Sequence, residues 1–219
     1  MLTAAAYVKI LVALLVLVNP FGIIPVFVTL TAQETEANRK RIAGIAAFAV
    51  CVVLIVSALL GEHIIEVFGI SIASFKVGGS ILVMLNAIAM MQASTSGVKQ
   101  TPEEAREAED KTSIAVVPLA IPLLAGPGTI STTIIYASES KSVAHLGIMV
   151  GIGVVIGFIT WVALRVATRV GRYMSQTAIN VATRLMGLLL AALAVEIFAS
   201  GAYELWSTLR LREIFPAVP

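Results

Sequence analysis

The sequence predicts an all-α, polytopic membrane protein with six transmembrane helices, arranged as two inverted three-helix repeats with broken helices 1 and 4. Composition is the first observation behind this prediction. The 219 residues are 58% hydrophobic and only 13% charged, whereas a soluble domain is about half apolar and about a quarter charged. Length is the second, because a spanning helix takes roughly 20 residues, which leaves room for six helices and short connections. The third is a pair of matching helix breaks, one in each half of the chain.

The rest of the composition excludes several classes of site and partner. The net charge is only +2, and no cluster of basic residues interleaved with aromatic residues occurs, so we expect no nucleic-acid binding. Cys51 is the only cysteine, which excludes an intrachain disulfide and a cysteine-based metal site. His63 and His145 lie in or beside predicted connections. We therefore predict no metal site and no cofactor.

The N-terminal half predicts three helices. Its first apolar stretch contains Lys9 and lacks a basic n-region and a small-residue cleavage site, so we interpret it as a retained helix rather than a signal peptide. The predicted helices are 4–31, broken in the middle, 42–60 and 72–91. The connection at 61–69 has room for a short interfacial turn. Residues 1–98 form the first predicted repeat.

The C-terminal half repeats this plan after a charged segment. Residues 99–112 are a predicted cytoplasmic linker, and the segment 101–104 within it has the cap, proline and glutamate of a short helix. Residues 113–219 form the second, inverted repeat with a C-terminal tail. The predicted helices are 113–138, again broken, 143–166 and 179–200.

The distribution of positive charge predicts the orientation in the membrane. Of the 15 Lys and Arg residues, five lie in the N-terminal part, the second and fourth connections and the tail, and ten lie in the other three connections. Cytoplasmic loops carry the excess of Lys and Arg. Both termini are therefore predicted outside, on the periplasmic side of the cell inner membrane.

Two sequence matches at nearly the same offset predict an internal duplication. Pro20 in the first break is offset by 107 residues from Pro127 in the second, and Lys76 is offset by 108 from Arg184. A unit of three helices must be inverted in its second copy. Inverted repeats with paired broken helices are typical of secondary transporters, whose substrate site lies at the repeat interface. Chance similarity between apolar segments is the alternative.

Each break supplies groups that suit a small zwitterion. An asparagine before a proline predicts that Asn19 caps a new helix starting at Pro20, and Pro127 predicts a second start. The free amides and positive dipole ends of such helices attract a carboxylate, and glycines let the backbone approach a ligand closely. The predicted substrate-binding residues are Asn19, Pro20, Phe21, Gly22, Gly126, Pro127, Gly128, Thr129 and Asn86. Structural kinks without a ligand are the alternative interpretation.

Three charged residues inside the predicted helices are candidate gating, carboxylate or proton contacts. Lys76 and Arg184 each lie about one turn inside a helix start, where a charge faces a cavity or partner or extends to the lipid headgroups. Glu196 is the only acid well inside a predicted helix, as proton coupling would need, although exposure at the membrane interface is an equal alternative.

Four motifs carry a resemblance to a known family: Asn19-Pro20-Phe21-Gly22 with Pro25, Phe68-Gly69-Ile70-Ser71 leading into Gly78-Gly79, Val117-Pro118-Leu119-Ala120-Ile121-Pro122 through Ala125-Gly126-Pro127-Gly128-Thr129-Ile130, and Arg184-Leu185-Met186-Gly187. Over nearly the whole chain they resemble the MarC family of six-helix inner-membrane proteins. The resemblance implies a carrier of small neutral amino acids such as glycine and alanine, related to LysE-type exporters. Lys76 departs from the family, in which an arginine is common at this position.

We therefore expect alternating-access transport of a small neutral amino acid, coupled to a proton, in a chain surrounded by membrane lipids and able to form a homo-oligomer. Export of other small metabolites or drugs is the alternative, although a wide lipophilic site is hard to build from 6% aromatic residues. A membrane-embedded enzyme would need a nucleophile and a base at membrane depth. No such pair is evident, so we predict that the chain is not an enzyme.

Overall fold

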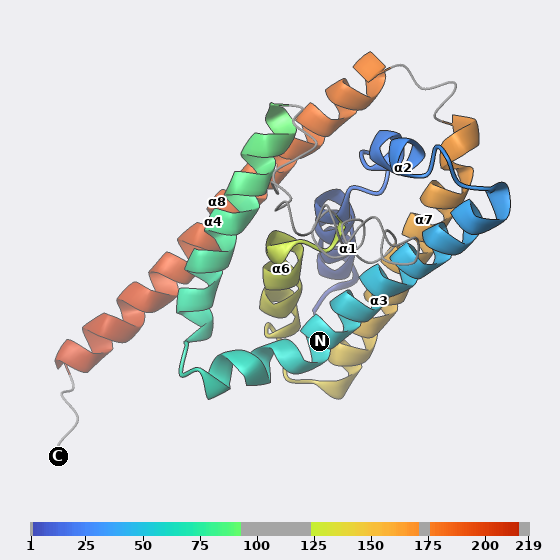
Figure 1. Ribbon diagram of the computed structural model, residues 1–219. Helices are drawn as coiled ribbons and strands as arrows, with labels where there is room; N and C mark the ends of the chain where they lie inside the picture. The colour runs from blue at the N-terminus through green and yellow to red at the C-terminus, as the bar shows by residue number, and fades with distance from the viewer. Residues whose placement is uncertain (1, 93–123, 171–175, 215–219) are drawn as a thin grey trace.

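The computed structural model describes residues 2–92, 124–170 and 176–214, and the regular elements in these ranges are helices, which confirms the predicted all-α class (Figure 1). The predicted linker at 99–112 lies outside the described residues. The helices are α1 (Ala4–Val18), α2 (Ile24–Leu30), α3 (Glu36–Val67), α4 (Ile72–Met91), α6 (Pro127–Ala137), α7 (Val143–Val170) and α8 (Gln176–Ile214).

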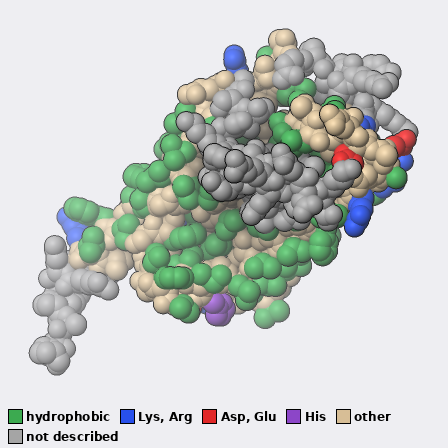
Figure 2. All heavy atoms as spheres, in the orientation of Figure 1, with side chains coloured by type: hydrophobic (Ala, Val, Ile, Leu, Met, Phe, Trp, Pro, Cys, Tyr) green, Lys and Arg blue, Asp and Glu red, His purple; other side chains and the backbone are tan. Residues whose placement is uncertain are grey.

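Four of these helices are long and apolar enough to cross a membrane, namely α3, α4, α7 and α8. Large apolar side chains cover their outer surfaces: Phe48, Phe158 and Leu189 are 70%, 61% and 63% exposed. Figure 2 shows hydrophobic side chains over much of the visible face. An apolar surface this extensive is unfavourable in water, so these helices are built to face lipid.

Two helices extend far beyond their predicted bounds, and α7 continues four residues past its predicted end, to Val170. α3 runs from Glu36 to Val67, so the region expected to hold an interfacial turn continues the helix instead. The Thr35 hydroxyl oxygen caps α3 by accepting from the Asn38 amide at 3.3 Å, and a turn at Gly69, with φ 68°, follows the helix. α8 likewise continues to Ile214. Apolar sequence marks only the part of a helix that lies in hydrocarbon, whereas the backbone hydrogen bonds continue until a cap or a turn ends them.

The long helices pack in two pairs, α3 with α7 and α4 with α8, and α6 contacts both α3 and α4 (Figure 1). Eight of the 11 residues of α6 are buried, so this short helix is enclosed by its neighbours. Glycines set the close approach of the pairs: a Cβ on Gly187 would lie 2.8 Å from the Ala87 carbonyl oxygen, and one on Gly157 would lie 2.8 Å from the Cys51 Cβ. Small residues at contacts are the usual means by which membrane helices approach each other.

Ion pairs join the helices at the end of the bundle where α3 turns into α4. Glu62 of α3 lies 3.5 Å from Lys141, which is in the connection between α6 and α7. Lys76 near the start of α4 pairs with Glu204 near the end of α8, with 2.5 Å between Nζ and Oε1. These contacts place the end of α8 and the α6–α7 connection at the same end of the bundle.

We predict that Gly187→Ala destabilises the protein because the added methyl group would meet the Ala87 carbonyl, which is main chain and cannot move aside. Overpacking of this kind costs about 1–3 kcal/mol. Thermal unfolding in detergent measures the effect. Gly147→Ala is the matched control, since a Cβ there would have no atom within 4 Å. Equal unfolding temperatures for the two variants would contradict the prediction.

Candidate functional site

The first helix break differs from the predicted geometry. Asn19 does not cap a helix that starts at Pro20, but instead ends α1 with φ 44° and ψ 57°, in the left-handed region. Its side-chain Oδ1 accepts from the Gly22 amide at 3.1 Å, and α2 begins only at Ile24. Asparagine enters the left-handed region more readily than other residues with a Cβ, and its side chain can bond the following turn. These two properties also suit the end of a helix, which is why the prediction was wrong.

The break leaves the end of α1 with unpaired carbonyls. Pro20 has no N–H to offer the Val16 carbonyl, and the carbonyls of Leu17 and Val18 accept no hydrogen bond from the described part of the chain. Leu17 and Val18 are 3% and 1% exposed. The negative end of the α1 dipole is therefore buried, and its last carbonyls have no donor among the described residues.

The second break has the predicted geometry. α6 begins at Pro127, and Gly126 precedes it with ψ 174° and no side-chain cap. The amides of Thr129 and Ile130 bond back to the Gly126 carbonyl at 2.9 and 3.1 Å, whereas the Gly128 amide has no acceptor among the described residues. Gly128 and Thr129 are buried and Pro127 is exposed. The positive end of α6 thus carries an amide that is available to an anion.

Thr132 adds an unpaired hydroxyl to the same helix end. Its side chain is 0% exposed, and its Oγ1 has no hydrogen-bond partner among the residues that the structure describes. Thr132 follows Gly128 by one turn on the same helix face, and helical side chains tilt toward the N-terminus. A buried hydroxyl without a partner costs about 1–3 kcal/mol, so a polar ligand at the start of α6 would relieve that cost.

A hydrogen-bonded histidine, which the sequence did not single out, joins α1 to α6 and α7. His145 is 0% exposed, with Nδ1 3.0 Å from the Tyr7 hydroxyl and Nε2 2.9 Å from the Tyr136 carbonyl oxygen. A carbonyl only accepts, so Nε2 carries the proton and Nδ1 accepts from Tyr7. Tyr7 is 138 residues from His145 in the sequence, and the only signal for the contact was a polar residue at the edge of each apolar segment.

This contact places the two breaks at a similar depth. α1 continues eleven residues from Tyr7 to Val18, and α6 starts nine residues before Tyr136. At 1.5 Å per residue the two helix ends lie about 16 and about 14 Å from the His145 contact. α1 and α6 pack against each other, and Figure 1 shows the start of α6 beside α1 near the centre of the molecule. The carbonyl end of α1 and the amide end of α6 therefore lie at a similar distance from the His145 contact.

The other predicted site residues do not gather at these ends. Lys76 is engaged by Glu204 of α8. Arg184 and Glu196 are both exposed on α8 and form no ion pair with a described residue. Phe21 is 46% exposed, so it is only partly enclosed at the first break.

Polar residues in the middle of helices are distributed differently. Asn86 is partly buried on α4. Thr160 of α7 is 0% exposed, and its hydroxyl has no hydrogen-bond partner within the described ranges. In the described ranges, no three His, Cys, Asp or Glu side chains could together hold a metal ion.

Glu139, in the connection between α6 and α7, is a titratable group that sequence reasoning missed. The residue is exposed overall, but nearby protein atoms partly desolvate the carboxyl, and this raises its pKa. Lys76 and His145 act in the opposite direction and lower the pKa, but their effect is smaller. The carboxyl therefore takes up a proton at a higher pH than an ordinary glutamate does.

We predict that Tyr7→Phe destabilises the protein by about 1–3 kcal/mol, because it leaves the buried His145 Nδ1 without a hydrogen bond. Thermal unfolding in detergent measures the loss. Tyr203→Phe is the control, since Tyr203 is 75% exposed and should tolerate the change. If Tyr7→Phe unfolds at the wild-type temperature, the contact does not contribute to stability.

Known proteins match nearly the whole chain. A family model described as "MarC family integral membrane protein" matches residues 4–206. UPF0056 membrane protein YhcE of Escherichia coli (strain K12) is 42% identical over 196 residues, which cover 89% of this chain and 91% of the relative. A UPF0056 membrane protein of Buchnera aphidicola subsp. Schizaphis graminum is 37% identical over 204 residues, with coverages of 93% and 94%.

A third relative, UPF0056 membrane protein YvbG of Bacillus subtilis (strain 168), is 35% identical over 196 residues and covers 89% of this chain and 92% of itself. No solved structure matches the chain. The matched range includes both helix breaks, α3, α4, α7 and most of α8, so the similarity extends over the site as well as the fold. The chain belongs to the MarC family of integral membrane proteins.

Proposed function

We propose that the chain is a secondary transporter of small neutral amino acids, of the size of glycine or alanine, that works by alternating access with a proton as the coupling ion. The observation that carries the proposal is the placement of the carbonyl end of α1 and the amide end of α6 at a similar depth in the protein. A zwitterion offers an ammonium to the first and a carboxylate to the second. Broken helices that present opposite dipole ends are the usual way in which transporters hold such ligands.

The helix packing supports an arrangement of six spans in two inverted repeats. In that arrangement α3 and α4 are the counterparts of α7 and α8, and α1 is the counterpart of the interrupted helix that ends in α6. α3 packs on α7, α4 packs on α8, and α1 contacts α6. Each of these helices therefore packs on its own counterpart, as helices on either side of a two-fold axis in the membrane plane do.

The charged residues support alternating access. Lys76 is paired with Glu204, whereas its counterpart Arg184 is exposed and has no ion-pair partner among the described residues. A transporter that is closed at one end and open at the other would show this asymmetry. Glu139 and Glu196 are the acids that we propose as carriers of the coupling proton, Glu139 because its pKa is raised and Glu196 because it lies well inside α8.

Gly128→Ala tests the binding site. A Cβ at this position would lie 3.6 Å from the Leu82 carbonyl oxygen, an ordinary contact, so the variant should fold. The methyl group would nevertheless stand beside the amide that we assign to the carboxylate. We expect the KM for glycine to rise about tenfold or more, equivalent to about 1.4 kcal/mol of binding. Uptake of radiolabelled glycine and alanine into proteoliposomes, with and without a pH gradient, measures it.

Gly147→Ala, on the outer surface of α7, is the control and should transport as the wild type does. Wild-type uptake by Gly128→Ala would remove the start of α6 from the binding site. Absence of saturable glycine or alanine uptake or exchange by the wild type would overturn the proposed function itself.

Orientation is tested separately with single cysteines in a Cys51→Ala background. Val143 is 85% exposed at the start of α7, so the Val143→Cys variant should react with an impermeant maleimide in intact cells. Gln33 is exposed between α2 and α3, and the Gln33→Cys variant should react only after the membrane is permeabilised. The opposite labelling pattern would place the termini in the cytoplasm.

A further inference from the structure

The contacts between α3 and α7 fix the register of this antiparallel pair. A Cβ on Gly157 would meet Cys51 and the Ala47 carbonyl, and one on Gly153 would meet Leu54. As residue numbers rise along α7 they therefore fall along α3. By this register Arg165, eight residues after Gly157, lies level with Arg41, and Phe158 lies level with Phe48.

These four side chains also lie on one side of the pair. The two helices are right-handed and antiparallel, so their residue numbers turn in opposite senses when both are viewed from the end that carries Arg41 and Arg165. From that end α3 leads away from the viewer and its residues follow one another clockwise. α7 leads toward the viewer and its residues follow one another anticlockwise. At about 100° per residue, Arg41 and Phe48 lie about a quarter turn clockwise from the α3 contact line. Arg165 and Phe158 lie about a quarter turn anticlockwise from the α7 contact line. Both rotations lead to the same side.

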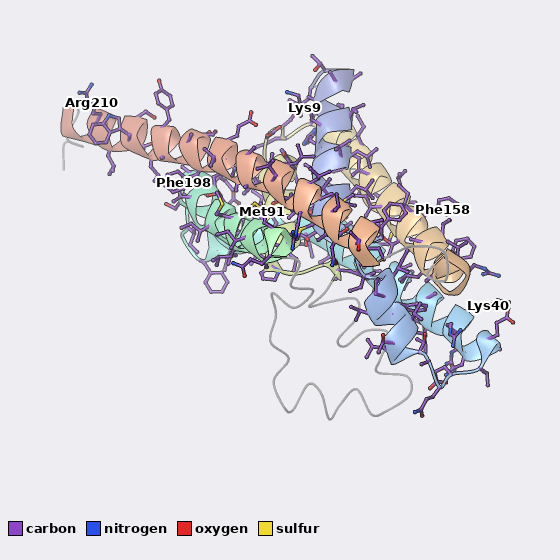
Figure 3. All side chains as sticks on the ribbon, turned by 90° about the horizontal axis from the view of Figure 1, so that it is seen from above. Lys9, Lys40, Met91, Phe158, Phe198 and Arg210 are labelled. Atoms are coloured by element: carbon purple, nitrogen blue, oxygen red, sulfur yellow. The ribbon has the colours of Figure 1, made fainter. Side chains whose placement is uncertain are left out.

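This side of the pair is an apolar face that points outward. Phe48 and Phe158 lie on it and are 70% and 61% exposed. Gly44 lies one turn before Phe48 on α3, and a Cβ there would have no heavy atom within 4 Å. Figure 3 shows Phe158 on α7 and Lys40 on α3 toward the same end of the molecule. Two exposed aromatic side chains with a glycine beside them fit an acyl chain, which hydrocarbon surroundings supply.

The two arginines at one end of this face form no ion pair with an acid in the described part of the chain. Arg41 is exposed and forms no ion pair within the described residues, and Arg165 lies 4.9 Å over the ring of Trp161 instead of against a carboxylate. Lys40, next to Arg41, already pairs with Glu36 at 2.6 Å. Tryptophan marks the level of the lipid headgroups, and the guanidinium fork matches a phosphate in two places.

We propose that the outward apolar face formed by α3 and α7 is a binding site for an anionic phospholipid. The phosphate lies between Arg41 and Arg165, and an acyl chain lies between Phe48 and Phe158. The site is separate from the helix breaks, so it stands whether or not the chain transports amino acids.

Tryptophan fluorescence tests the site, since the chain has only two tryptophans. Trp206→Phe leaves Trp161 as the reporter, and the protein is reconstituted in phosphatidylcholine vesicles with brominated phosphatidylglycerol or brominated phosphatidylcholine as the quencher. We expect phosphatidylglycerol to quench Trp161 with at least fivefold higher relative affinity. Arg41→Gln keeps the Arg165–Trp161 contact and should lower that preference by about fivefold. This is the effect expected from losing the attraction of one cation to an anionic lipid.

Two controls make the test specific. Trp161→Phe leaves Trp206 as the reporter. Arg210 lies 5.8 Å over the ring of Trp206 on α8, and it follows Trp206 by the same number of residues as Arg165 follows Trp161. Trp206 should show a smaller preference for phosphatidylglycerol. Arg41→Lys keeps the charge without the fork, so its preference should fall between that of the protein with Arg41 intact and that of the Arg41→Gln variant. Equal preference at Trp161 and Trp206, or no change in Arg41→Gln, would overturn the proposed site.

Discussion

Hydrocarbon offers no hydrogen-bond partner to a peptide group, and this constraint explains the arrangement of the helices. A long helix such as α3 completes its backbone hydrogen bonds internally and can face lipid along much of its length. α6 has only 11 residues, and Gly128 and Thr129 in its first turn are buried, so its first amides need protein around them. It is accordingly enclosed by α3 and α4 and touched by α1 and α7. The two pairs of long helices form the walls that this short helix requires.

Glycines in the walls let α6 come close enough to be enclosed. A Cβ on Gly79 of α4 would lie 3.0 Å from the Ser131 Cβ of α6, and Gly128 of α6 lies against the Leu82 carbonyl. Gly61 of α3 has no room for a Cβ beside Ile134. The same residues that look like generic membrane packing in the sequence thus have a specific role, which is to seal a helix end away from lipid.

Several polar groups at the two breaks lack a hydrogen-bond partner in the described part of the chain, which costs stability. Carbonyls at the end of α1, the Gly128 amide and the Thr132 hydroxyl are polar groups that folding places in the interior without partners from the described chain. Unsatisfied groups of this kind concentrate where function requires them. His145 has the opposite character, because both of its ring nitrogens are engaged. It fixes the position of α1 relative to α6 and thereby the distance between the two breaks.

Composition determined the class of this protein, because apolar content decides whether a chain enters a membrane. The prolines in the two helix breaks determined where a helix cannot continue. Together they located the start of α6 at Pro127 and the four long helices, and the sequence motifs placed the chain in its family. Tertiary structure alone decided the role of Asn19, because a residue suited to a turn can either start or end a helix. It also decided the partners of Lys76 and His145, since contacts between helices depend on which faces meet, and local sequence does not encode that choice.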